Sequence, residues 1–266
     1  MSEFSELWRA RYGSAEAPAI DGLADFLQHR SVRDFDLGRP VSEELIAGLV
    51  AAAQSASTSS NLQLYSVVSI EDPDLRAQVN EHCSNQRQVA LAPWFFGFFV
   101  DHHRLRHKLA ELEISADSLD YADYFLMGVV DAALAAERMV VAAECLGLGV
   151  CYIGALRNNP VAIAQLLGMP SGLFGVFGLC IGYPDPAKPA AVKPRLSQDR
   201  IWFRDRYDAE AGIGDYDERM AAFFASEKQD PSVTWSARSG RRLEEKYMTR
   251  RQVVLNFLRD SGLLRR

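Results

Sequence analysis

The chain has 266 residues, of which 48% are hydrophobic, and a formal net charge of −6 at pH 7. This length and apolar content are enough to bury the core of one elaborated domain. Because nucleic-acid-binding proteins carry clustered positive charge, the acidic balance speaks against nucleic acid as a partner. No secretory signal or membrane span is visible, and the four cysteines form no C-x-x-C pair. We therefore expect a reduced, cytoplasmic protein whose cysteines are small, buried thiols.

The first part of the chain predicts short helices and buried strands. A short helix is expected over residues 20–28, and the basic segment 29–35 follows as extended chain. Ser42 before two glutamates is a good N-cap for a helix over residues 43–56, because the acidic first turn complements the helix dipole. Further elements follow in order: a strand at 65–70, a helix at 72–83 and an aromatic, buried strand at 93–100.

The longest helical signal covers residues 121–146. It is rich in Ala, Leu and Val almost all round, which marks a helix buried in a core or in a subunit interface. Asp131 and other charged residues interrupt it too often for a membrane span. Strands are predicted at 150–153 and 173–183. Because glycine weakens a strand, the second one predicts close approach of another backbone or a ligand at Gly175, Gly178 and Gly182.

The last part of the chain has amphipathic helical patterns from Gly212 onward, with an irregular loop around Pro231. Its apolar content is too small for independent folding, so we interpret it as an arm that wraps over a partner subunit. We expect a core domain over residues 1–205 and a C-terminal helical extension over 206–266. Basic residues at helical spacing between 238 and 251 are interpreted as an exposed helix face.

The common catalytic and nucleotide-binding motifs are missing from this sequence. The segment 147–152 stops short of G-x-G-x-x-G and follows a helix rather than a strand, and no P-loop, G-x-S-x-G or HExxH motif occurs. His103 and His107 have the i,i+4 spacing of some metal ligands. No cysteine or carboxylate set completes a site there, and basic neighbours crowd the pair, so no metal site is predicted.

Hydrogen-bond donors gather instead in two cationic segments. His29-Arg30-Ser31-Val32-Arg33 contains two guanidinium groups, an imidazole and a hydroxyl, which suit a phosphate. Lys193-Pro194-Arg195 follows a Pro-rich loop far downstream. Each segment alone could be solvated surface charge. Together with the hydroxyl run at 57–61, they favour a large, phosphate-bearing cofactor that carries the chemistry itself, so that the protein supplies binding and orientation.

These segments resemble the FMN-dependent nitroreductases, in the group that includes flavin reductase P and the major oxygen-insensitive bacterial nitroreductase. The likeness runs from about residue 29 to residue 216, and more loosely to the C-terminus. It implies an α+β fold with a central, mostly antiparallel sheet flanked by helices, in an intertwined homodimer with FMN at the interface. The stretches that carry it are HRSVRDF (29–35), STSSNLQ (57–63), GVVDAALAAE (128–137), GLGVCYIGALRNNP (147–160), LFGVFGLCIGYP (173–184) and KPRL (193–196).

The resemblance implies which residues bind FMN. Ser31, Lys193 and Arg195 would meet the phosphate, with the residues before Ser31 along the phosphate and ribityl chain. Arg33 would lie toward N1 and O2 of the isoalloxazine, where a cation stabilises the anionic reduced flavin. The full expected set is His29, Arg30, Ser31, Val32, Arg33, Thr58, Gln86, Tyr152, Ile153, Gly154, Ala155, Lys193 and Arg195.

Some members of this set have more specific implied places. Thr58 and Gln86 would reach FMN from the other subunit. Residues 152–155 would present their backbone to the flavin, with the Gly154 N–H near N5. Ala155 stands where the group usually has a second glycine, a change that a backbone contact should tolerate.

The resemblance also implies substrate-binding positions at Ser60, Asn61 and Lys228. Asn61 occupies a position near the flavin face where a relative carries an aromatic residue, so acceptor preference should differ. Relatives place arginines in the loop of Lys228 to bind the 2′-phosphate of NADPH. Here Glu227 and Asp230 accompany the lysine and would repel that phosphate, so the loop itself leaves the nicotinamide preference open.

The implied activity is that of an NAD(P)H-dependent flavin oxidoreductase, either nitroreductase or FMN reductase. Hydride would pass from the nicotinamide, with NADPH as the favoured donor, to flavin N5 in a ping-pong cycle. The acceptor would be a small molecule such as a nitroaromatic, a quinone or free flavin, and no side chain is expected to be catalytic. The alternatives are a specialised flavoenzyme, for reductive dehalogenation or a biosynthetic redox step, and a non-catalytic flavin-binding protein.

Overall fold

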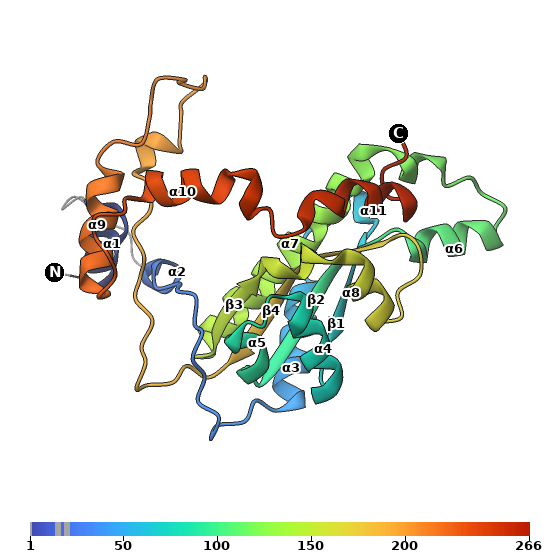
Figure 1. Cartoon of the computed structure of the whole chain (residues 1–266), viewed down its shortest axis with the longest axis horizontal. Coiled ribbons are helices and arrows are strands. Elements are labelled where there is room, and N and C mark those ends of the chain that lie inside the picture. The colour runs from blue at the N-terminus through green and yellow to red at the C-terminus, as the bar shows by residue number, and fades with distance from the viewer. Residues whose placement is uncertain (1, 14–16, 19–21) are drawn as a thin grey trace. The chain divides into compact units, whose positions relative to one another are not determined.

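The computed structural model describes residues 2–13, 17–18 and 22–266 (Figure 1). The chain forms two compact units. We call Met1–Arg30 with Ala190–Met248 the terminal unit, and Ser31–Pro189 with Thr249–Arg266 the sheet unit. The expected domain boundary at residue 205 stays a prediction.

The sheet unit is built on four strands, β1 (Tyr65–Ser69), β2 (Trp94–Asp101), β3 (Gly149–Ile153) and β4 (Leu173–Gly182). Their order in the sheet is β1-β2-β4-β3, and every neighbouring pair is antiparallel. The predicted α+β class and antiparallel sheet are confirmed. Each predicted strand occurs within one residue of its expected start and end.

The two faces of β2 pack against different helices because its side chains alternate across the sheet. Phe96, Phe98 and Val100 join the main core, which also contains buried residues of α3 (Glu43–Gln54) and α7 (Ala122–Cys145). On the other face, Phe99 lies against Leu156 and closes the space above two glycines of the sheet. The long apolar helix predicted at residues 121–146 is therefore a core helix, though Leu126, Val130 and Leu134 remain exposed on it.

The remaining helices are short. Of the helix predicted over 20–28, the structure has only α2 (Ala24–Leu27), and residues 20–21 lie outside the described part. The sheet unit also holds α4 (Pro73–His82), α5 (Arg87–Leu91), α6 (His103–Glu111), α8 (Pro160–Leu166) and α11 (Val254–Asp260), with the 3-10 turns η1 (Ser59–Asn61), η2 (Asp117–Asp120), η3 (Gly154–Asn158) and η6 (Arg251–Val253). The terminal unit holds α1 (Glu3–Tyr12), α2 (Ala24–Leu27), α9 (Tyr216–Ser226) and α10 (Trp235–Leu243), with η4 (Gln198–Arg200) and η5 (Glu245–Tyr247).

The glycines of β4 make room for neighbouring side chains. A Cβ at Gly178 would lie 2.6 Å from the ring of Phe95, and one at Gly182 would lie 2.5 Å from Pro93. The expected close approach is thus made mainly by an aromatic ring and a proline of the same unit. It gives no evidence of a ligand at these positions.

Three of the four cysteines are buried, as the sequence predicts, but Cys145 is exposed at the end of α7, where the expectation was wrong. The rings of His103 and His107 stack on α6 with centroids 6.0 Å apart. The described residues contain no group of three or more His, Cys, Asp or Glu side chains that could hold a metal ion. Nor does any helix among them have the length and apolar character needed to cross a membrane.

Candidate functional site

The predicted site residues are divided between the two units. The terminal unit contains His29, Arg30, Lys193, Arg195 and Lys228. The sheet unit contains Ser31, Val32, Arg33, Thr58, Ser60, Asn61, Gln86, Tyr152, Ile153, Gly154 and Ala155.

Within the terminal unit, one buried side chain joins the two predicted cationic segments. Arg11, near the end of α1, donates a hydrogen bond from Nη2 to the carbonyl of His29 at 2.5 Å. Its Nη1 donates to the carbonyl of Lys193 at 2.8 Å. The N–H of Arg195 in turn donates to the carbonyl of Arg11 at 2.7 Å. The structure therefore brings together two segments that are far apart in the sequence.

The charges on these segments suit an anion. Arg30 donates to the carbonyl of Gln28 at 3.1 Å, and Arg195 lies near the carbonyls of the two residues before it. In the described part of the chain, neither guanidinium is ion-paired with a carboxylate. Two cations without an anionic partner, on segments that one side chain holds together, supply the donors that a phosphate requires.

Helix α9 supports the downstream cationic segment from its other side. The hydroxyl of Tyr216 donates to the carbonyl of Pro194 at 3.0 Å, and burial raises the pKa of this phenol, which keeps it protonated as a donor. Arg219 donates from Nη1 to the carbonyl of Arg195 at 2.8 Å. The backbone of residues 194–195 is thus fixed while the Arg195 side chain stays exposed.

In the sheet unit, the continuation of the first cationic segment runs beside β3. Val32 donates from its N–H to the carbonyl of Val150 at 2.8 Å, and its buried side chain fills the space left by the missing Cβ of Gly149. Ser31 and Arg33 are exposed on either side of it. The extended backbone therefore anchors Val32 in the core and leaves the two flanking side chains available to a ligand.

Residues 152–155 lie at the junction of β3 and η3, and two of them line an open cavity of about 630 Å3. Tyr152 and Gly154 contribute to its wall, opposite apolar side chains of α7. Ile153 points into the core and is only 1% exposed. The volume lies within the roughly 300–1,000 Å3 of small-molecule pockets. The other lining residues are Val130, Ala133, Leu134, Glu137, Arg157 and Phe177.

Tyr152 is fixed within this cavity by two neighbours. Its hydroxyl donates to a carboxylate oxygen of Glu137 at 3.1 Å, and its ring packs edge-on against Phe177 at 5.1 Å between centroids. Burial, together with the charge of Glu137, raises the pKa of Tyr152 well above its usual range. The phenol therefore stays neutral at physiological pH.

Arg251, which no sequence motif indicates, holds the η3 turn. Its Nη2 donates to the carbonyl of Gly154 at 3.1 Å, and its Nε donates to Oδ1 of Asn158 at 2.9 Å. The interpretation of residues 238–251 as an exposed helix face is wrong for this half-buried residue. Nothing in the local pattern separates Arg251 from the basic residues around it, because its partners lie about a hundred positions earlier.

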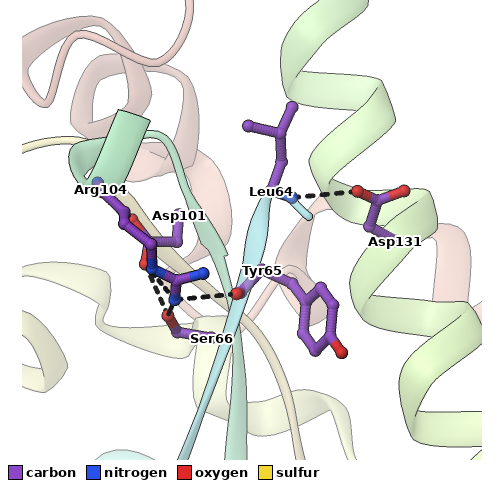
Figure 2. A network of polar contacts seen from close by, with 6 residues as sticks. All are labelled: Leu64, Tyr65, Ser66, Asp101, Arg104 and Asp131. Carbon is purple, nitrogen blue, oxygen red and sulfur yellow. Dashed lines mark hydrogen bonds and ion pairs between the residues drawn. The ribbon is translucent and has the colours of Figure 1, made fainter. Parts of the chain in front are cut away.

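The hydroxyl run at 57–61 is held by a second missed residue, Asp131 of α7. One carboxylate oxygen accepts from the N–H of Ser59 at 2.8 Å. The other accepts from the N–H of Leu64 at 3.0 Å, as Figure 2 shows. The intervening backbone is left-handed at Ser60 and Asn61, with φ of 50° and 56°. Few non-glycine residues adopt this conformation, so the buried carboxylate fixes a strained loop.

This arrangement places the predicted residues of the loop at the surface. Thr58 is half-buried, whereas Ser60 and Asn61 are exposed. At the far end of the loop, β1 is secured by a separate polar network. Ser66 donates to Asp101 at 2.5 Å, and Arg104 donates to both side chains at 2.6 and 3.1 Å (Figure 2).

Gln86 caps the start of α5 and is engaged within its own turn. Its side-chain amide donates to the carbonyl of Cys83 at 3.0 Å, and its amide oxygen accepts from Gln88 at 2.6 Å. The same turn is tied to η3, because Asn158 donates to the hydroxyl of Ser84 at 3.0 Å. The structure thus connects the turn of Gln86 with the segment that contains Gly154.

Lys228 is exposed in the loop after α9, and no described contact joins it to the other predicted site residues. Arg238 of α10 faces the same loop. It donates to Oε1 of Gln229 at 3.4 Å and stacks on the ring of Phe224 at 3.7 Å. Asp230 is bonded by Ser232, which lowers its pKa, with a smaller contribution from Arg238 and Arg241. Asp230 therefore keeps its negative charge, and Arg238 and Arg241 partly offset that charge.

Comparison with known proteins identifies the class of this chain. The family model described as the nitroreductase family matches residues 27–183, and that of the nitroreductase family C-terminal domain matches residues 193–266. The chain belongs to the nitroreductase family, as the sequence predicts. An NADPH-dependent oxidoreductase of Staphylococcus aureus is 34% identical over 248 residues, which cover 90% of this chain and 96% of that protein.

Solved structures agree with this assignment. The NfrA1 nitroreductase from Bacillus subtilis superposes with a TM-score of 0.84 at 29% identity, covering 92% of this chain and 99% of that one. The NADPH:FMN oxidoreductase from Vibrio harveyi, complexed with NAD+, gives a TM-score of 0.78 at 32% identity, covering 92% and 99%. The predicted nitroreductase fold and the predicted NAD(P)H-dependent oxidoreductase class are confirmed.

Proposed function

We propose that this protein is an FMN-dependent enzyme that takes hydride from NAD(P)H and reduces a small acceptor by two electrons in a ping-pong cycle. The observation that carries the proposal is the convergence of the two cationic segments on Arg11. It supports a phosphate-binding role for the two segments of the terminal unit in which the resemblance to nitroreductases leads us to expect one. FMN and NADPH are also the compounds named for the Vibrio harveyi relative.

Bound FMN would supply the redox chemistry, since its N5 accepts and donates hydride. The chain supplies binding and orientation. The side chains of Arg30, Lys193 and Arg195, all in the terminal unit, would hold the phosphate, because charge-assisted hydrogen bonds are the strong ones. Arg33 would place its cation near N1 and O2 and favour the negative charge that reduction leaves there.

The cavity of the sheet unit would hold the ring system and the molecules that react with it. Its walls are apolar on the α7 side, at Val130, Ala133 and Leu134, so they suit flat, largely apolar molecules. Gly154 would direct its N–H toward flavin N5, and its carbonyl is already bonded to Arg251. One open pocket used in turn by nicotinamide and acceptor accounts for a ping-pong cycle. Nitroaromatics, quinones and free flavin are the proposed acceptors.

The preferred hydride donor is NADPH in this proposal. Lys228 is exposed, and Arg238 faces the same loop, so two cations would be available to a 2′-phosphate. Glu227 and Asp230 oppose them. We therefore expect a modest preference for NADPH over NADH.

The proposed working form is a homodimer in the cytoplasm. Large side chains of the terminal unit stay exposed in this chain, among them Trp202, Tyr207 and Leu243. Such surface is usual where a partner binds. The C-terminal extension would cover the partner subunit, and Thr58 and Gln86 would reach the partner's flavin.

The test begins with purified protein. Its visible spectrum, before and after addition of FMN, shows whether flavin binds, and stopped-flow mixing with NADPH shows whether bound flavin is bleached. Steady-state turnover with nitrofurazone and a quinone then follows. Absence of flavin binding would refute the proposal. Binding without bleaching would indicate a non-catalytic flavin protein, and bleaching with negligible turnover would indicate a specialised enzyme, such as a reductive dehalogenase.

A further inference from the structure

Helix α1 lies outside the residues that the two nitroreductase family models match. The two family models match residues 27–183 and 193–266, whereas α1 covers Glu3–Tyr12. The helix is well formed, with Ser2 accepting from the N–H of Ser5 as N-cap and Gly13 at φ 72° after its last turn. A regular helix outside the family models raises the question of what it adds to the site.

Arg11 connects this helix to the proposed phosphate site. Its side chain is 4% exposed, and its guanidinium donates to three carbonyls, those of Leu27, His29 and Lys193. Its own carbonyl accepts from the Arg195 N–H at 2.7 Å and from Nη1 of Arg219 at 3.1 Å. The side chain and the backbone carbonyl of Arg11 therefore both bind the backbone of the cationic segments.

The direction of these hydrogen bonds matters for anion binding. A carbonyl oxygen carries partial negative charge and would repel a phosphate. Because Arg11 binds the carbonyls of His29 and Lys193, their partial negative charge is directed toward a buried cation and away from any bound anion. The guanidinium also adds positive potential beneath the cationic segments.

The contacts also determine how ordered the segments are before a ligand arrives. Loops that must be ordered on binding lose affinity, because the entropy cost is taken from the interaction energy. Here the side chain of Arg11 fixes residues 29 and 193 through hydrogen bonds within the chain itself. The phosphate would meet donors that already have their positions.

From this geometry we propose that Arg11 is a positioning residue for the FMN phosphate, and that α1 holds the two phosphate-binding segments together so that FMN stays tightly bound. This inference rests on the proposed function. It assigns to α1 a role in the affinity and the dissociation rate of the cofactor. Arg11 would not touch the flavin itself.

The test compares three variants of the full-length protein, each freed of flavin and then reconstituted. Arg11→Met removes all side-chain hydrogen bonds, and Arg11→Lys keeps the charge but not the three-way geometry. Arg9→Met is the matched control, since Arg9 lies on the same helix with an exposed side chain. The measurements are the Kd and dissociation rate of FMN by fluorescence quenching, and the Kd of riboflavin, which lacks the phosphate.

We expect Arg11→Met to raise the Kd of FMN at least tenfold and to speed its dissociation, with Arg11→Lys between this variant and the wild type. The Kd of riboflavin should change less than twofold, so the preference for FMN over riboflavin should collapse. Arg9→Met should resemble the wild type. If Arg11→Met does not fold, the comparison of Arg11→Lys with the wild type decides.

Two results would overturn the inference. One is an unchanged FMN affinity in both Arg11 variants. The other is an equal loss of affinity for FMN and riboflavin, which would show that α1 supports the fold without acting on the phosphate. A wild-type protein that binds neither flavin would instead refute the proposed function, so the two failures are distinguishable.

Discussion

Replacement of Asp131 by asparagine should destabilise the protein and loosen the hydroxyl-rich loop. The carboxylate is fully buried and accepts one backbone N–H on each oxygen, at 2.8 and 3.0 Å. An asparagine amide has a single oxygen and would turn an N–H₂ group toward one of these donors. One buried N–H would then lose its partner.

The magnitude follows from these contacts. A hydrogen bond to a charged group contributes about 1.5–3 kcal/mol, and a buried donor left unsatisfied costs about 1–3 kcal/mol. The relief of burying a charge offsets part of this. We expect Asp131→Asn to lower the free energy of unfolding by about 2–4 kcal/mol. The loop with left-handed Ser60 and Asn61 should relax, and the KM for the acceptor should rise.

Urea unfolding followed by circular dichroism measures this change, with the shift of the midpoint multiplied by m giving the free energy. Asp123→Asn is the control, because Asp123 lies on the same helix with an exposed side chain, and should stay within about 0.5 kcal/mol of the wild type. A loss below about 0.5 kcal/mol for Asp131→Asn would refute the argument that the buried carboxylate fixes the loop.

Four further predictions concern separate groups. Arg195→Ala should weaken FMN binding by about 1.5–3 kcal/mol; unchanged affinity in a titration of flavin-free protein would remove Arg195 from the phosphate site. Lys228→Ala should lower the ratio of kcat/KM for NADPH over NADH, and an unaltered ratio would show that the loop does not bind the 2′-phosphate. In native protein one thiol should react rapidly with DTNB and be lost in Cys145→Ser, because Cys145 is exposed while burial raises the pKa of Cys83 to about 12; more than one fast thiol would contradict this. Burial lowers the pKa of His102, so near this pKa the unfolded chain binds a proton that the folded chain does not. The free energy of unfolding should therefore fall as the pH drops below about 6.5. If His102→Gln loses as much stability over the same pH range, groups other than His102 cause the loss.

The fold was largely predictable because its signals are local. Ser42 before two glutamates gave the start of α3, and the aromatic run at 93–100 gave β2, since capping and apolar periodicity depend on neighbouring residues. The exposure of Cys145 was not predictable in this way. It depends on which side of α7 faces the sheet, and the helix is apolar almost all round.

The sequence predicted only those residues of the candidate site that are proposed to contact the ligand. Short charged motifs indicate three of the proposed residues, Arg30, Lys193 and Arg195. Three others, Arg11, Asp131 and Arg251, act by hydrogen bonds to the backbone of distant segments. Nothing near Arg11 in the sequence indicates that it binds the carbonyl of Lys193. Likewise, the sequence shows Asp131 only as a charged residue within an apolar helix. Residues that position a site through the backbone leave no local pattern.

The final eighteen residues of the chain, 249–266, have a bearing on how the enzyme can be altered. They return to the sheet unit and are joined to it at both ends, by Arg251 on the turn of Gly154 and by the N–H groups of Arg265 and Arg266 on the carbonyl of Asp120. Trimming this tail would therefore change the wall of the proposed reaction pocket as well as shorten the protein. Conversely, substitutions at Arg251 would alter this wall without changing the sequence of either cationic segment.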